Sequence, residues 1–146
     1  MKVLIQRVKN ASVTIDGSLY SEIGKGILAL VGIEKGDSQE QIIKAAKKVV
    51  NLRIFPDEND KMNLSLADVQ GEMLIVSQFT LCGDCTKGTR PSFDKSAPPD
   101  IANELYEKFI EEVKSYGIKI GHGKFGAMMD VALINDGPVT FMVEVG

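Results

Sequence analysis

The stretch that most constrains this chain is Gly71–Leu81, a short apolar run that ends in polar residues. Its centre, Met73–Val76, shows no alternation and contains β-branched side chains, which is typical of a central strand covered on both faces. Ser77, Gln78 and Thr80 follow at once. Polar groups at the end of a buried strand are unfavourable unless they are hydrogen-bonded or face a ligand. The stretch therefore predicts a buried strand that leads into a functional site.

Length and charge limit the class of protein. A chain of 146 residues suffices for about one domain that buries roughly two thirds of its unfolded surface, so we predict a single domain over residues 1–146. The net charge of −3 argues against a general nucleic-acid binder held by phosphate contacts, although it leaves room for a local basic patch.

The sequence also bears on where the protein works. No segment approaches the ~20 consecutive apolar residues of a membrane span. Arg7 interrupts the only early apolar stretch, Val3–Val8, so the N-terminus does not resemble a signal peptide. The two cysteines, Cys82 and Cys85, are too few for a disulfide framework. We expect a cytoplasmic protein with reduced thiols and no membrane association.

The first third of the chain predicts strands and then a helix. The predicted strands are Lys2–Val8, a hairpin of Ser12–Ile15 and Leu19–Ile23 around Asp16-Gly17, and Ile27–Ile33. Two overlapping capping boxes, Asp37 with Glu40 and Ser38 with Gln41, then indicate the start of a helix. Its predicted apolar face consists of Ile42, Ala45, Ala46, Val49 and Val50.

A second helix is predicted after Ser96–Asp100, with Gly117 as its C-terminal stop. Its expected apolar face consists of Ile101, Leu105, Tyr106, Phe109, Ile110, Val113 and Tyr116. Short apolar segments at Ile118–Ile120, Met128–Ile134 and Val139–Val145 predict three further strands, with the chain turning at Asn135–Pro138. The order of elements indicates an α/β fold with a mixed sheet and two helices.

Three groups of residues invite a chemical interpretation that the residue types support only weakly. Cys82-Gly83-Asp84-Cys85 is a C-x-x-C pair, but a structural zinc needs four ligands and a thioredoxin-like motif should open a helix. His122 is the only histidine and lies between two glycines, which favours a solvated loop residue over a Ser-His-Asp site. The acids of Asp57–Lys61 lack the glycine and distal Glu of a calcium loop.

The polar residues after the central strand have two interpretations. Ser77 and Thr80 are either nucleophiles or groups that cap the strand end, and an unactivated hydroxyl is weak without a nearby base. Gly137-Pro138 is either an ordinary turn or a cis bond that places two carbonyls side by side, where they can accept hydrogen bonds from a substrate ammonium. Four cations of the glycine-rich loops are either phosphate contacts or solvated charges, namely Lys87, Arg90, Lys95 and Lys124.

Two separated motifs resemble those of the D-aminoacyl-tRNA deacylases, also called D-tyrosyl-tRNA deacylases. The first is Ser77–Leu81 with Lys87–Phe93, and the second is Gly123–Met129 with Asn135–Thr140. The resemblance extends over essentially the whole chain, including Gln6–Val8. It implies a three-layer α/β/β fold with a largely antiparallel mixed sheet and two main helices. It also implies a homodimer with the active site at the subunit interface.

The resemblance further implies hydrolysis of the ester that joins a D-amino acid, or mischarged glycine, to the 3′ end of tRNA, without a metal or organic cofactor. Ser77, Gln78, Phe79 and Thr80 would then line the ester and the terminal adenosine as catalytic residues. The substrate-binding residues would be Gly137 and Pro138, which hold the α-ammonium and exclude an L side chain, Arg7, which fixes the Gly-Pro turn, and Phe125 and Met129, which contact the base.

Within the family, Thr80 is either an acyl-accepting nucleophile or only a lining residue. In the second mechanism the 2′-hydroxyl of the last ribose assists a water, and backbone N–H groups near Phe79 and Thr80 polarise the ester carbonyl. The missing base favours this second mechanism. Two functions from other classes stay open: a tRNA 3′-end binding module without catalysis, and a thiol-redox protein that uses Cys82 and Cys85. In many family members an aromatic residue stands where this chain has Cys82.

Overall fold

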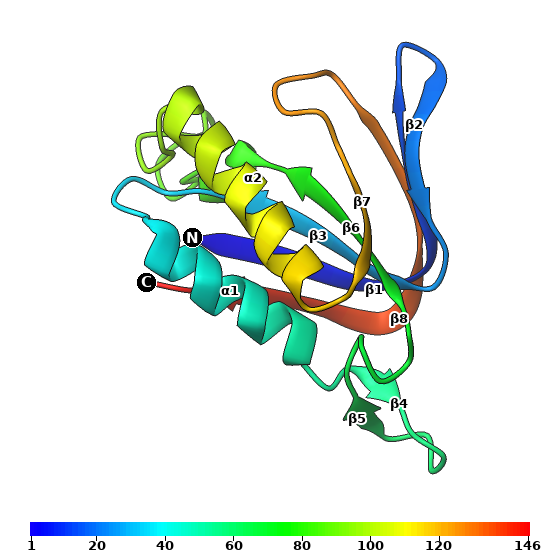
Figure 1. The fold of residues 1–146 in the computed structure, drawn as a ribbon. Coiled ribbons are helices and arrows are strands. Elements are labelled where there is room, and N and C mark those ends of the chain that lie inside the picture. The colour runs from blue at the N-terminus through cyan, green and yellow to red at the C-terminus, as the bar shows by residue number, and fades with distance from the viewer.

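The computed structural model describes residues 1–146 and contains eight strands, two α-helices and one short 3₁₀-helix (Figure 1). The strands are β1 (Lys2–Ile15), β2 (Ser18–Ile23), β3 (Gly26–Gly32), β4 (Phe55–Pro56), β5 (Met62–Leu64), β6 (Glu72–Ser77), β7 (Lys119–His122) and β8 (Asp130–Glu144). The helices are α1 (Gln39–Asn51), η1 (Phe79–Cys82) and α2 (Pro99–Ser115).

The main sheet is mixed and mostly antiparallel, as predicted. β1 pairs antiparallel with β2, β3 and β8, whereas β3 pairs with β6, and β6 with β7, in parallel. β2 and β7 stand at the two ends of the strand order and contact each other, so the sheet curls almost into a barrel. α1 and α2 lie against each other on one face of the sheet (Figure 1).

The N-terminal half of the sheet corrects one predicted boundary. The segments Lys2–Val8 and Ser12–Ile15 form one continuous strand, β1, rather than two. The predicted hairpin at Asp16-Gly17 is confirmed, and both residues have the positive φ angles that its tight turn requires, 50° and 76°. Because β1 is long, it can pair with β3 along one half, with β2 along the other, and with β8 along both.

β3 and β6 are buried on both faces, which explains why their sequences do not alternate. The side chains of Met73–Val76 are at most 1% exposed. One face of these strands packs under the helices, and the other packs inside the curl of the sheet. The contact between the two strands is close, because a Cβ atom on Gly26 would lie 1.7 Å from the carbonyl oxygen of Glu72. Only glycine fits at that position.

Both helices form where the sequence predicts them. At the start of α1 the backbone N–H of Ser38 donates to Gln41 Oε1 over 2.8 Å, which confirms the second capping box. Asp37 does not cap the helix, because its carboxylate accepts from the backbone N–H of Glu34. On α2 the predicted apolar face is correct except at its ends, where Ile101 and Tyr116 are exposed by 44% and 39%.

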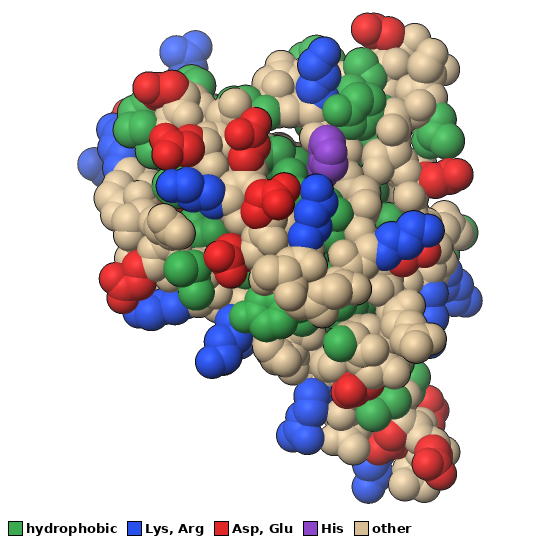
Figure 2. Space-filling view, in the orientation of Figure 1, with side chains coloured by type: hydrophobic (Ala, Val, Ile, Leu, Met, Phe, Trp, Pro, Cys, Tyr) green, Lys and Arg blue, Asp and Glu red, His purple; other side chains and the backbone are tan.

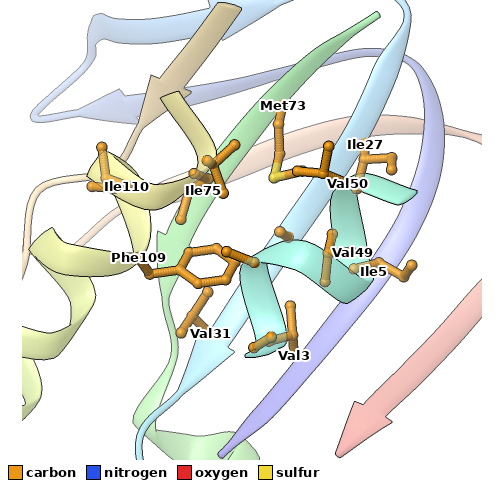
Figure 3. Close-up of a cluster of buried hydrophobic side chains, with 14 of the residues drawn as sticks. Val3, Ile5, Ile27, Val31, Val49, Val50, Met73, Ile75, Phe109 and Ile110 are labelled. Carbon is orange, nitrogen blue, oxygen red and sulfur yellow. The ribbon is translucent and has the colours of Figure 1, made fainter. Parts of the chain in front are cut away.

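The larger hydrophobic core fills the space between the two helices and the sheet (Figure 3). Phe109 of α2 lies at its centre and is fully buried (Figure 3), so its truncation to Ala would cost about 3–5 kcal/mol. The core side chains around it come from α1, α2, β1, β3 and β6, namely Val49, Val50, Ile110, Val3, Ile5, Ile27, Val31, Met73 and Ile75.

The C-terminal strand departs from the prediction of two strands joined by a turn. Asn135–Pro138 does not reverse the chain, because β8 continues through it from Asp130 to Glu144. Asn135 pairs with Val8 and Thr140 with Gln6, so the intervening residues bulge out of the ladder opposite Arg7. Residues that usually form a turn are thus accommodated in a bulge, and the strand continues beyond them.

No helix of the structure is both long and apolar enough to cross a membrane. No group of three or more His, Cys, Asp or Glu side chains is placed so that it could hold a metal ion.

Candidate functional site

The end of β6 exposes the first group of predicted site residues. The N–H of Gln78 donates to the carbonyl of Val31 over 2.8 Å, after which the chain leaves the sheet and enters η1. Ser77 and Gln78 are half-buried, whereas Phe79 is 57% exposed and Thr80 is also exposed. The Gln78 amide donates a hydrogen bond to Thr80 Oγ1. The buried strand thus ends in a polar, accessible surface, as the sequence predicts.

The loop that follows β7 lies alongside the end of β6. Gly123 N–H donates to Ile75 O over 2.9 Å, and the sulfur of Met129 would lie 2.8 Å from a Cβ atom placed on Gly123. Phe125 and Met129 are half-buried there. The structure therefore brings these two predicted base contacts to the same end of the sheet as Ser77.

Tyr106 is a supporting residue that sequence reasoning placed only in the core. Its hydroxyl lies 2.8 Å from the carbonyl oxygen of Ile75 and 3.2 Å from that of Gly123, so it joins α2 to β6 and to the loop after β7. Its ring packs beside Phe125 with a centroid distance of 6.1 Å. Burial raises the pKa of Tyr106, so the hydroxyl stays protonated and can donate. A tyrosine on the buried stripe of a helix was the only sequence signal for it.

The segment from Asp84 to Ser96 closes over η1. Asp84 and Ser92 exchange two backbone hydrogen bonds of 2.7 Å and 2.9 Å. Hydrogen bonds from Thr86 hold the pKa of Asp84 below its usual value. The Phe93 ring meets Phe79 edge to face at 5.2 Å, and Ser96 Oγ donates to the Phe79 carbonyl over 3.3 Å. Phe79 thus has a positioned carbonyl and ring although its side chain is exposed.

The second group of predicted residues lies in the bulge of β8. The Gly137–Pro138 bond is cis, as predicted, and both residues are exposed. Arg7, which is buried, lies with Nε 3.0 Å from Asp136 Oδ2 and donates from Nη1 to Ile54 O over 2.6 Å. The structure therefore places Arg7 against the bulge.

Asn135 closes the base of the same bulge. Its side-chain amide donates to the carbonyls of Arg7, over 2.9 Å, and Val139, over 3.2 Å. One side-chain amide therefore connects the two ends of the bulge, before and after the exposed Gly137–Pro138 pair, and also binds β1. The sequence placed Asn135 in a turn and in the second family motif but gave it no role of its own, because its cross-strand partner could not be known without the register.

Within one chain the two groups lie apart. Ser77 pairs with Val31, which pairs with Val3, whereas the bulge lies opposite Arg7. Ser77 and the bulge are thus separated by four residues along β1, or about 13 Å, and by three strand spacings across the sheet, or about 14 Å. The end of β6 and the Gly-Pro bulge of the same chain thus do not form one pocket.

A model of the family described as D-Tyr-tRNA(Tyr) deacylase matches residues 4–144. The chain belongs to this family. Curated relatives called D-aminoacyl-tRNA deacylase include those of Thermosipho africanus, with 97% of the relative covered, and Desulfatibacillum aliphaticivorans, with 99% covered. Each is 56% identical over 144 residues, or 99% of this chain.

Solved structures agree with the deacylase-family fold. One titled "c-Myc DNA Unwinding Element Binding Protein" is similar with a TM-score of 0.94 and 42% identity, covering 100% of this chain and 99% of that one. Another, a probable eukaryotic D-amino acid tRNA deacylase, has a TM-score of 0.85 at 17% identity, covers 99% and 98% of the two chains, and shows the fold alone.

In this deacylase-family chain the cysteines and the histidine do not form a catalytic group. Cys82 is buried with Sγ 3.6 Å from Ile33 O, while Cys85 is exposed, and both thiols are free. Burial raises the pKa of Cys82, which disfavours the reactive thiolate. His122 contacts the Gly123 carbonyl and the Tyr20 ring, and it makes no hydrogen bond to the end of β6.

Proposed function

We propose that the protein hydrolyses the ester of D-aminoacyl-tRNA, releasing the free D-amino acid and tRNA. The observation that carries this is the match of the deacylase family model to residues 4–144, with full-length relatives of that name at 54–56% identity. The protein is accordingly a hydrolase that acts on ester bonds. Neither alternative function, the non-catalytic binding module or the thiol-redox protein, finds support.

The catalytic wall in this proposal is the end of β6, with Ser77, Gln78, Phe79 and Thr80. Thr80 Oγ1 already accepts a hydrogen bond from Gln78, and it forms no hydrogen bond with a carboxylate or an imidazole. A hydroxyl without a base is a weak nucleophile. We therefore assign Thr80 to lining the site, while the ribose 2′-hydroxyl assists water. The first N–H groups of a helix lack intrahelical partners, so those of Phe79 and Thr80 can polarise the ester carbonyl.

The terminal adenosine would contact Phe125 and Met129. Both are half-buried in the loop after β7, beside the end of β6. A partly exposed aromatic ring and a flexible thioether suit a flat base, because they offer apolar area with little reorganisation. Tyr106 would support these contacts from beneath, since its hydroxyl joins the loop to β6.

The opposite wall would come from a second copy of the chain. The exposed Gly137–Pro138 pair is too far from Thr80 of its own chain, so a two-fold homodimer that exchanges bulges would complete two equal sites. The carbonyls of the pair would bind the α-ammonium, and their bulk would reject an L side chain but accept glycine. Arg7 would hold this wall through Asp136. The same proposal includes a three-layer α/β/β arrangement of each domain, as the resemblance implies. It also includes work in the cytoplasm, where aminoacyl-tRNA is used.

The activity is tested with purified protein and tRNA charged with D- or L-tyrosine. We expect release of D-tyrosine well above the buffer rate, retention of L-tyrosine, and release of mischarged glycine. Equal release of D- and L-tyrosine would contradict chiral selection, and release of neither would contradict the esterase.

A further inference from the structure

A groove of about 740 Å³ lies between α1 and the C-terminal part of β8, away from the residues assigned to the ester. Four cations line it, namely Lys44, Lys47, Lys48 and Arg53, and Glu144 is its one acid. Lys and Arg side chains are visible along the lower edge of α1 in Figure 2. In a chain whose net charge is −3, this groove is a local concentration of positive charge.

Helical spacing brings these lysines together. Lys44, Lys47 and Lys48 recur at intervals of three and four residues, so they share one stripe of α1 next to its buried face. Lys44 forms an ion pair with Glu40 at 3.0 Å. Lys47 and Lys48 make no ion pair, and Arg53 contacts only the neutral amide of Asn63 over 3.1 Å. Three exposed cations therefore lack an acidic partner.

The shape of the groove favours a chain of phosphates over a single small anion. Its cations are exposed: the three lysines extend over about 6 Å of the helix axis, and Arg53 follows beyond the end of α1. A site for one anion instead converges several donors on a point. Exposed lysines that line an open groove give the electrostatic, sequence-independent contact typical of a nucleic-acid backbone. A tRNA presents such a backbone to an enzyme that processes its 3′ end.

The groove is also within reach of the ester site. Val143, in its lining, pairs with Val3, which pairs with Val31, which pairs with Ser77. The groove and the end of β6 thus share one row of the sheet, separated by three strand spacings, or about 14 Å. A single-stranded 3′ end could span this distance while the duplex lies farther out.

We propose that this α1 groove binds the phosphate backbone of the tRNA body while the 3′ end enters the ester site, an inference that rests on the proposed function. The test measures binding of uncharged tRNA to the full chain by fluorescence anisotropy. The variant Lys47→Glu/Lys48→Glu should raise Kd about tenfold or more and flatten the slope of log Kd against log salt by about 1.5. The control is Lys61→Glu/Lys119→Glu, which makes the same charge change on two exposed residues without an ion pair, one directly before β5 and one in β7.

A second measurement separates the groove from the ester site. With D-tyrosyl-tRNA, the groove variant should raise KM about tenfold more than it does with D-tyrosyl-adenosine, which is too short to reach α1. The proposed tRNA contact at the groove would be wrong if wild type and groove variant had equal Kd values. It would also be wrong if the groove and control variants lost the same affinity for tRNA. Absence of turnover by wild type would instead contradict the proposed function, and the tRNA-binding measurement would still decide the groove.

Discussion

Arg7 Nε lies 3.0 Å from Asp136 Oδ2, so a buried cation of β1 contacts the residue that precedes the exposed Gly137–Pro138 pair. Nε makes no aligned hydrogen bond, so this contact is chiefly ionic. Arg7 is fixed in turn by the carbonyl of Ile54. The bulge is therefore joined to the interior of the domain by this charge contact, in addition to the hydrogen bond from Asn135 to the Arg7 carbonyl.

Removing this contact should loosen the bulge. Asp136→Asn leaves Arg7 without a charge partner, and because Asp136 is 32% exposed we expect a loss of about 1–2 kcal/mol of unfolding free energy. The kcat/KM for D-tyrosyl-tRNA should fall because the Gly137 and Pro138 carbonyls, which we propose bind the substrate ammonium, lose their position. Urea unfolding and steady-state kinetics measure the two effects. Asp130→Asn, on the same strand without an ion pair, is the control, and equal behaviour of the two variants would contradict the role.

Thr80→Ala should retain turnover within about tenfold of wild type, because removing a true nucleophile costs ~10⁴-fold or more. The hydroxyl accepts from Gln78 and has no base. Single-turnover rates with D-tyrosyl-tRNA measure the effect, and Thr80→Ser controls for the loss of the methyl group. A tRNA ending in 2′-deoxyadenosine should be a poor substrate for all three proteins. Loss of activity in Thr80→Ala alone, with the deoxy substrate still cleaved, would instead make Thr80 the nucleophile.

Two inactive variants should complement each other if each site combines walls from two chains. Gln78→Ala weakens the β6 wall and Gly137→Val obstructs the bulge, yet a mixed dimer keeps one site with both walls intact. Random reassortment should restore about a quarter of wild-type activity, since half of the dimers are mixed and each has one good site. Co-expression with two affinity tags provides the mixed species. If the mixed dimer is as inactive as its parents, the shared site is wrong.

Native thiol titration should detect Cys85 alone. Cys85 is exposed, whereas Cys82 is buried and burial raises its pKa, so little thiolate is available at neutral pH. Raising the pH increases the Cys82 thiolate, but access still requires opening of the structure. Unfolding in urea should release the second thiol, and Cys85→Ser should keep esterase activity. Rapid reaction of both thiols in the native protein would revive the redox hypothesis.

Local sequence patterns correctly predicted the elements whose burial follows a simple periodicity. β3 and β6 read as unbroken apolar runs because both of their faces are covered, and α1 has a capping box and a clear apolar stripe. The predicted apolar face was wrong at the ends of α2, because residues four apart are rotated by about 40° around the helix axis at each step. Ile101 and Val113 therefore cannot both face the core, and the sheet selects Val113.

Features that depend on pairing partners could not be predicted. Asn135–Pro138 has the composition of a turn, and only the ladder with β1 makes it a bulge inside a continuous strand. The partner of Arg7 was expected to be the Gly-Pro segment, but the specific groups, Asp136 and the Ile54 carbonyl, follow from the register. The sequence placed Tyr106 in the core but did not predict its hydrogen bonds, because these depend on two backbone carbonyls from distant segments.

Tyr106→Phe should weaken substrate binding without disturbing the shape of the core. The change leaves the carbonyls of Ile75 and Gly123 without the hydroxyl between them, which should cost about 1–2 kcal/mol of unfolding free energy. Because Phe125 packs on the Tyr106 ring, the loop after β7 should become more mobile and KM should rise more than kcat falls. Hydrogen exchange of the Gly123 amide, together with kinetics on D-tyrosyl-tRNA, measures both. Tyr116→Phe, exposed at the C-terminal end of α2, should change neither. If Tyr106→Phe loses stability with KM unaltered, the hydroxyl serves the fold alone.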